Sequence, residues 1–185
     1  FGFDFRRIMA PGPINSAYGW LRWQYIQDAL REGYEYAVLL ETDVLVGNSE
    51  VDLREAVRER PLAMYYGQVP GGEPLHYQTG AIYARNDPEL LKFLAAMMEC
   101  CPAVEVPEEA GGWWLRQFCQ QTEAHRLLHT PRWEGVVTKL DARWNCLPNA
   151  HPQPIVFGWH GVAGERDKLE MMRAQVATFL PRETK

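Results

Sequence analysis

The sequence lacks any apolar run long enough to cross a membrane. Its longest uninterrupted apolar runs fall far short of the roughly 18 residues that suggest a membrane span, and no basic-then-apolar signal region opens it. The 4 cysteines have no C-x-x-C spacing, which argues against a zinc site. Because Cys100 and Cys101 are adjacent and make a poor disulfide framework, we expect free thiols in a reducing, cytoplasmic compartment.

The chain also lacks an excess of basic residues. Its 19 Lys and Arg against 24 Asp and Glu give a net charge of -5, which argues against direct nucleic-acid binding through electrostatics. It contains no internal repeat, low-complexity segment or inter-domain linker. A chain of 185 residues with 46% apolar residues suffices for one domain with a real core. We therefore predict a single domain over residues 1–185.

The most informative stretch that is present covers residues 37–46, AVLLETDVLV. It is an apolar run, followed by two carboxylates one residue apart and then by more apolar residues. Such a run is typical of a strand covered on both faces in a parallel or mixed α/β sheet. Glu41 and Asp43 then stand at the carboxyl end of the strand, where open α/β sheets bind ligands. If the chain stays extended they point to the same side, and two such carboxylates suit a hard divalent cation.

The remaining patterns predict strands that alternate with helices, which indicates an α/β sandwich. Ser16 caps a helix that stops at Gly33, and Asp87-Pro88 opens another that runs through Glu99. The first helix is predicted to bury the residues Tyr18, Leu21, Tyr25, Ile26, Ala29 and Leu30. Further strands are expected at 3–9, 62–67, 77–84, 127–128, 136–140 and 155–159, and further helices at 51–58, 113–121 and 165–180.

The ordered set of motifs resembles glycosyltransferases of the GT-A fold, the nucleotide-diphospho-sugar transferase superfamily. Glu41-Thr42-Asp43 follows a helix and an apolar strand, then come residues 77–83, YQTGAIY, residues 140–145, LDARWN, and finally His160-Gly161. The resemblance spans roughly residues 15–161. It implies a mixed, mainly parallel central sheet flanked by helices. In these enzymes a D-x-D motif at a strand end holds a divalent cation, usually manganese, which grips the diphosphate of the sugar donor.

The resemblance also implies roles for particular residues. The implied ligands of a Mn²⁺ or Mg²⁺ ion are Asp43, Glu41 and His160. The implied donor-binding residues are Glu41, Thr42, Asp43, Gln78, Thr79, Gly80 and Gly161. The acceptor side would include Trp113, Trp144 and Asn145, with support of the metal loop as the alternative role of the Trp144-Asn145 pair. The catalytic candidates are Gln78 beside the donor sugar and an acid at a helix start, Glu109 or Glu108, which in inverting members deprotonates the acceptor hydroxyl.

Three features depart from the family pattern. The first acid is Glu41, one methylene longer than aspartate, so an alternative role is to reach the ribose or a metal-bound water. The small turn reads Gln78-Thr79-Gly80 where asparagine is commoner. Only about 35 residues precede the acidic strand, so at roughly 30 residues per βαβ unit the resemblance predicts a fold shortened at its amino end.

We therefore expect a metal-dependent hexosyl- or pentosyltransferase that uses a nucleoside-diphosphate-sugar donor and a glycan, lipid-linked or other hydroxyl acceptor. One alternative is a metal-dependent nucleotidyltransferase or phosphohydrolase, which usually shows a glycine-rich phosphate loop or further Asp/His clusters. Another is a non-catalytic carbohydrate- or nucleotide-binding domain derived from the same fold, which the short amino end favours. The other histidines are expected on loops or surfaces: His76, His125, His129 and His151.

Overall fold

The structure is a computed structural model that describes Asp4 and residues 16–41, 43–67, 75–100, 113–145, 153–158 and 169–174. Within these ranges only the backbone is described for residues 16–18, 113–119 and 157–158. Apart from Asp4, the opening strand predicted at residues 3–9 lies outside the described residues.

A four-stranded sheet forms the centre of the molecule, with strand order β1-β4-β3-β5. Its strands are β1 (Tyr36–Leu40), β3 (Leu62–Gly67), β4 (His76–Arg85) and β5 (Val137–Leu140). Both β1 and β3 pair antiparallel with β4, while β3 pairs parallel with β5. The expected α/β fold with a mixed sheet is confirmed. Three of the four strands share one direction, although two of the three described pairings are antiparallel because the reversed strand β4 is central.

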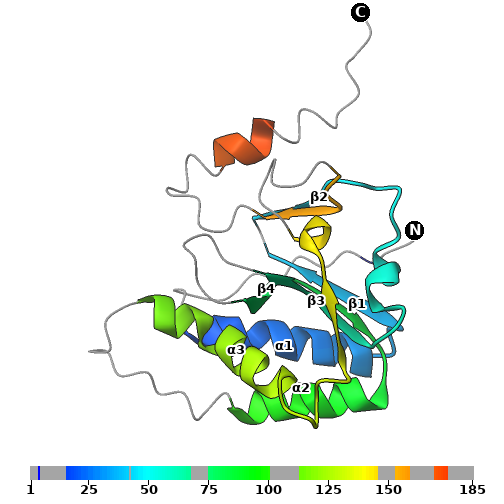
Figure 1. Cartoon of the computed structure of the whole chain (residues 1–185), viewed down its shortest axis with the longest axis vertical. Coiled ribbons are helices and arrows are strands. Elements are labelled where there is room, and N and C mark those ends of the chain that lie inside the picture. Colours follow the sequence, from blue (N-terminus) through cyan, green and yellow to red (C-terminus); the bar gives the residue numbers. More distant parts are fainter. Residues whose placement is uncertain are drawn as a thin grey trace, which may run out of the picture.

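Helices cover one side of this sheet and a small second sheet lies on the other (Figure 1). The helices are α1 (Ser16–Arg31), α2 (Pro88–Cys100) and α3 (Trp113–Leu128). The second sheet pairs β2 (Val44–Val46) antiparallel with β6 (Val156–Gly158). Two 3₁₀ helices, η1 (Leu53–Val57) and η3 (Ala142–Trp144), lie on the same side, and residues 169–174 are also helical.

The sheet separates two hydrophobic clusters. On the helix side, Trp23 and Phe93 pack against Ile82 of β4. On the other side, Tyr83 of β4 packs against Trp144. Strand β4 is buried along nearly its whole length, whereas all of β1 is partly exposed. The expectation that residues 37–40 form a strand covered on both faces is confirmed, because Ala37 and Leu39 pack against the helix-side cluster and Val38 and Leu40 against the other cluster. These residues remain partly exposed because β1 is an edge strand among the described ones, and β4 takes the central place.

Helix α1 confirms the predicted bounds but corrects the predicted buried face. Gly33, just beyond its end, has a φ of 101°, a left-handed conformation that glycine adopts without strain. Trp20 and Trp23 are buried together with Ile26 and Leu30, whereas the predicted Leu21 and Tyr25 are partly exposed. The buried face therefore differs from the predicted one. Burial of Trp23 is favourable because its indole N–H donates to Gln120 of α3.

Two other predicted elements differ from the structure. Residues 127–128 are the last turn of α3 rather than a strand. The helix expected at 51–58 is the shorter 3₁₀ helix η1, capped by the Asp52 carboxylate, which accepts a hydrogen bond from the backbone N–H of Arg54. The other predicted strands of the described ranges match within about two residues. None of the helices in the described ranges combines the length and the apolar character needed to cross a bilayer.

Candidate functional site

The candidate site lies at the edge of the sheet where β1, β3 and β5 end. Because these strands point the same way, their carboxyl ends meet there, together with the start of the reversed strand β4. Ligands bind at this edge in open α/β sheets. Glu41 and Asp43 directly follow β1, and Gln78 to Gly80 belong to the first half of β4. The sequence-predicted acidic motif and the predicted donor segment therefore share one edge.

A bulge in β4 brings these two segments into contact. Met64 of β3 pairs with Ile82, but Tyr66 pairs with Tyr77, so β4 advances five residues where β3 advances two. The extra residues fall in the stretch 78–81. Bulges often re-aim side chains next to active sites. At this point the backbone N–H of Glu41 donates to the Gly80 carbonyl at 2.9 Å, which fixes the acidic turn against the bulge.

Gln78 has the side chain most suited to contact a ligand. Gln78 lies at the start of the bulge, between Tyr77, which packs in the helix-side cluster, and Thr79, which bonds to residues of α1 and α3. Its residue is only 8% exposed, and its Nε2 has no hydrogen-bond partner among the described residues. An unpaired buried amide costs about 1–3 kcal/mol. A ligand oxygen that accepts from Gln78 would remove this cost.

Arg22 of α1 links the acidic turn to the bulge. Its Nη2 lies 2.5 Å from the Glu41 Oε1, and its Nη1 donates to the Thr79 Oγ1 at 2.7 Å and to the Thr79 carbonyl at 3.2 Å. The Arg22 and Glu41 side chains are only 17% and 29% exposed, so solvent screens this ion pair weakly. One carboxylate oxygen of Glu41 is thus engaged by a guanidinium.

Helix α3 completes this network. The Gln121 Oε1 accepts from the Thr79 hydroxyl at 3.1 Å and from its backbone N–H at 3.3 Å. The Gln120 Nε2 donates to the Thr79 Oγ1 at 3.2 Å, while its Oε1 accepts from the Trp23 indole at 2.9 Å. Thr79 is only 1% exposed, which favours a positioning role over direct donor contact. Sequence reasoning missed Arg22, Gln120 and Gln121, because their only signal was polar character on otherwise amphipathic helices.

Replacing Arg22 with methionine is expected to lower the free energy of unfolding by about 2 kcal/mol, because it removes the guanidinium that contacts the Glu41 carboxylate and the Thr79 carbonyl in a partly buried place. Urea denaturation measures this change. A double-mutant cycle with Glu41→Gln should give a coupling energy of about 1 kcal/mol or more.

The matched control for Arg22 is Arg54→Met. Arg54 also pairs with a carboxylate, that of Asp52, but its side chain is 44% exposed. We expect the control to cost clearly less than Arg22→Met, because exposed ion pairs contribute little to stability. Equal losses of unfolding free energy in the two variants would contradict the inference that the Arg22 ion pair contributes more because it is partly buried.

The register of the second sheet places the end of β6 beside the acidic turn. Val44 pairs with Gly158, and the Val44 N–H donates to the Glu41 carbonyl at 3.0 Å. Gly158, the last residue of β6, thus lies opposite the residue that follows Asp43. His160 is only two residues farther along the chain, but it lies outside the described residues.

Other predicted site residues lie outside the described part as well. They are Thr42, Glu108, Glu109, Gly161 and the side chain of Trp113. Within the described ranges, no three His, Cys, Asp or Glu side chains come together in a way that would hold a metal ion.

Trp144 packs in the hydrophobic cluster that lies between the central sheet and the second sheet, and Asn145 follows it in the chain. Trp144 is 7% exposed and packs edge-on against Tyr83, with ring centroids 5.3 Å apart. The Tyr83 hydroxyl donates to the Trp144 carbonyl at 3.0 Å. Asn145 is 3% exposed. Because the Trp144 ring has so little free surface, its position favours support of the adjoining loop over direct contact with an acceptor.

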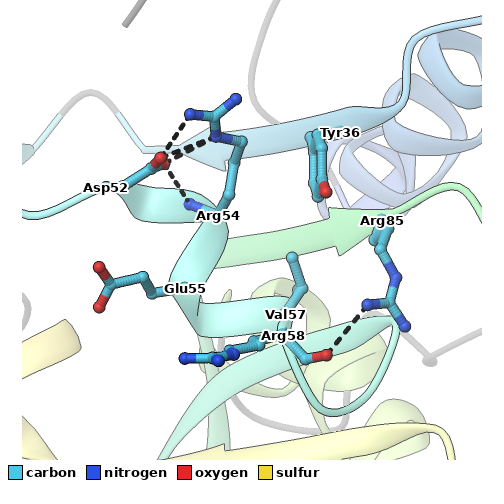
Figure 2. Close-up of a pocket in the computed structure, with 7 residues that line it drawn as sticks. All are labelled: Tyr36, Asp52, Arg54, Glu55, Val57, Arg58 and Arg85. Atoms are coloured by element: carbon cyan, nitrogen blue, oxygen red, sulfur yellow. Dashed lines mark hydrogen bonds and ion pairs between the residues drawn. The ribbon is translucent and has the colours of Figure 1, made fainter.

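A cavity of about 300 Å³ lies at the other end of the sheet. Figure 2 shows that Tyr36 from the start of β1 and Arg85 from the end of β4 line it together with residues of η1. Arg54 is bound to Asp52, and the Arg85 Nη1 donates to the Arg58 carbonyl at 3.0 Å. Since β1 runs from this cavity to Glu41, the cavity is separate from the candidate site.

Three histidines come together near the start of β4. His76 is its first residue, His125 lies in the last turn of α3 and His129 follows that helix. The His125 ring centroid is 4.6 Å from that of His76 and 4.2 Å from that of His129. As expected, His129 is exposed, whereas His76 and His125 are partly exposed and belong to regular elements rather than loops; His151 lies outside the described residues.

The surroundings of His125 make stability depend on pH. Desolvation, aided by His129, His76 and Lys139, lowers the pKa of His125 to about 4. Between pH 6.5 and 4 the unfolded chain binds a proton at this residue that the folded chain does not, so stability falls as pH falls through this window. We expect the stability difference between the wild type and His125→Gln to shrink from pH 7 to pH 4.5 in urea titrations. A difference that stays constant over this range would contradict the lowered pKa.

Comparisons with known proteins support the fold. No family model matches the chain, and no curated protein shows a significant match. Among solved structures, the chain is similar to the crystal structure of a glycosyltransferase involved in the glycosylation of the major capsid of PBCV-1. The TM-score is 0.61 at 18% sequence identity, and the match covers 89% of this chain and 82% of that one. At this identity the likeness establishes the mixed α/β fold.

Proposed function

We propose that the chain is a glycosyltransferase that moves a hexosyl or pentosyl group from a nucleoside-diphosphate-sugar donor to a hydroxyl acceptor, with a divalent cation at the diphosphate. The register of β2 and β6 is the observation that carries this proposal. It puts Gly158, two residues before His160, opposite the neighbour of Asp43. The likeness of the whole fold to a glycosyltransferase supports the same function.

The proposed metal ligands suit a cation such as Mn²⁺ or Mg²⁺. Asp43 and Glu41 offer hard carboxylate oxygens and His160 an imidazole nitrogen, a mixture that manganese accepts well. Because Arg22 engages one oxygen of Glu41, Asp43 is the principal carboxylate ligand in this proposal. When bound, the cation would stabilise the negative charge that develops on the leaving diphosphate.

The protein's own residues have distinct parts in this mechanism. The Gln78 amide, buried and unpaired in the described structure, would donate to the donor sugar. Arg22 holds Glu41 and Thr79 in place and adds a positive charge at the edge where an anionic donor would bind. Glu109 or Glu108 would take the proton of the acceptor hydroxyl, and Trp113 would flank the acceptor, whereas Asn145, only 3% exposed, would support the adjoining loop with Trp144.

A panel of sugar nucleotides, each incubated with the chain and MnCl₂, tests the proposal. We expect slow hydrolysis of at least one donor to the nucleoside diphosphate, lost on addition of EDTA. Formation of a nucleoside triphosphate and a sugar 1-phosphate when pyrophosphate is added would point instead to a nucleotidyltransferase. Metal-dependent binding by calorimetry without hydrolysis or transfer would favour the non-catalytic domain. If the folded chain neither binds nor hydrolyses any donor, the proposal is wrong.

A further inference from the structure

A group of basic side chains gathers at the same sheet edge, beyond the segment that contains Gln78. We call it the basic cluster and define it as His76, His125, His129 and Lys139. Its members come from β4, α3, the turn after α3 and β5, so only the tertiary structure brings them together. Two aromatic residues pack beside it. The Lys139 Nζ lies 4.2 Å from the Tyr66 ring centroid, and the Tyr66 and Tyr77 ring centroids are 4.9 Å apart.

Among the described residues, no carboxylate forms an ion pair with the basic cluster. The groups that act on His125 are all basic, and no carboxylate of the described residues forms an ion pair with Lys139. Tyr77 supplies no charge either, because burial raises its pKa to about 12. Four basic groups that lie together repel one another whenever they are protonated, and a bound anion lowers this repulsion.

The members remain accessible to a ligand and offer hydrogen-bond donors. His129 and Lys139 are exposed, and His76 and His125 are partly exposed. The His129 Nδ1 lies 2.8 Å from the His125 carbonyl, which fixes that nitrogen as the N–H donor to the carbonyl. Protonation of the His129 ring would then add an N–H at Nε2, beside the Tyr66 hydroxyl at 3.5 Å.

We propose that the basic cluster is a binding subsite for an oxyanion group, a phosphate, sulfate or carboxylate, on the acceptor. This inference rests on the proposed transferase function. Lys139 of the cluster lies on β5, and β4 and β3 separate β5 from β1, the strand that Glu41 and Asp43 follow. Three strand spacings of about 4.8 Å make roughly 14 Å, too far for the diphosphate of a donor held at Asp43. The cluster is one helical turn from Gln121, so α3 connects it to the Arg22 network.

Titration of the whole chain with sodium phosphate tests the subsite. Two-dimensional NMR of the histidine rings, with sodium chloride at matched ionic strength as the reference, should show saturable shifts of the His76, His125 and His129 signals. Because anion binding favours the protonated rings, we expect binding about tenfold tighter at pH 6.0 than at pH 7.5. Sulfate and glucuronate are titrated in the same way. Tighter binding of glucuronate would indicate an acceptor that contains a sugar acid, and tighter binding of phosphate or sulfate would indicate an acceptor that carries a phosphate or sulfate ester.

Lys139→Gln is the test variant and Lys92→Gln is its control. Lys92 is an exposed lysine on α2 that pairs with Glu89, away from the basic cluster. We expect Lys139→Gln to weaken binding about fivefold or more and Lys92→Gln to leave it unchanged. Both changes are at exposed side chains, and backbone amide spectra will verify that each variant is folded.

Two results would overturn the subsite. One is the absence of a saturable shift with all three anions at pH 6.0, and the other is equal binding by Lys139→Gln and the wild type. Neither donor nor metal ion is present in these titrations, so their failure is distinct from a failure of donor hydrolysis.

Discussion

Replacing Asp43 with asparagine is expected to lower metal-dependent donor hydrolysis by about 100-fold or more, because it removes the principal anionic ligand from the proposed cation site. The amide keeps the size of the side chain, so the turn between β1 and β2 should persist. Initial rates with the best donor of the panel, measured over a range of MnCl₂ concentrations, provide the measurement. Calorimetry with Mn²⁺ and the matching nucleoside diphosphate should show a parallel loss of binding.

The matched control for Asp43→Asn is Asp52→Asn. Asp52 caps η1 at the other end of the sheet, and asparagine caps a helix about as well as aspartate. We expect its activity to stay within about twofold of the wild type. Full metal-dependent activity in Asp43→Asn would refute the assignment of Asp43.

Replacing Trp23 with alanine is expected to lower the free energy of unfolding by about 3–5 kcal/mol. Trp23 is completely buried in the helix-side cluster, and it meets Phe93 edge-on at a centroid distance of 6.0 Å. Its indole N–H also satisfies the Gln120 Oε1 at 2.9 Å. The variant therefore loses packing and leaves a buried acceptor without its donor. Urea denaturation followed by circular dichroism measures the loss.

The variant Trp23→Phe separates the two contributions. Phenylalanine keeps much of the packing but cannot donate to Gln120, so we expect a loss of about 1–3 kcal/mol. Because Gln120 also bonds to Thr79, this variant should reduce donor hydrolysis as well. A loss below about 1.5 kcal/mol for Trp23→Ala would show that Trp23 is not a core residue.

The local elements of the fold follow closely from sequence patterns. Strand β3 has the predicted bounds, Leu62–Gly67, and α2 begins at Pro88, where the Asp87 carboxylate accepts from the Glu89 N–H at 2.8 Å. These signals are local, since strand composition and capping act within a few residues. The end of α3 was missed because a two-residue apolar pair does not distinguish a strand from a last helical turn.

The candidate site was predictable only in part. The run of residues 37–46 identified Glu41 and Asp43 because a strand that ends in acids is a pattern within one segment. Arg22 was missed because it lies on α1, and nothing in that helix indicates that its guanidinium reaches Glu41 and Thr79. The basic cluster was missed for the same reason, since its members come from separate elements.

The sequence by itself determined the order of helices and strands and the place of two carboxylates at the end of β1, because these depend on periodicity and capping along one segment. Only the tertiary structure decided that β4 runs between β1 and β3, that its bulge meets the acidic turn, and that β6 ends beside Asp43's neighbour. Strand order and register depend on packing between distant segments. The same packing engages Glu41 with Arg22 and leaves Gln78 buried without a described partner.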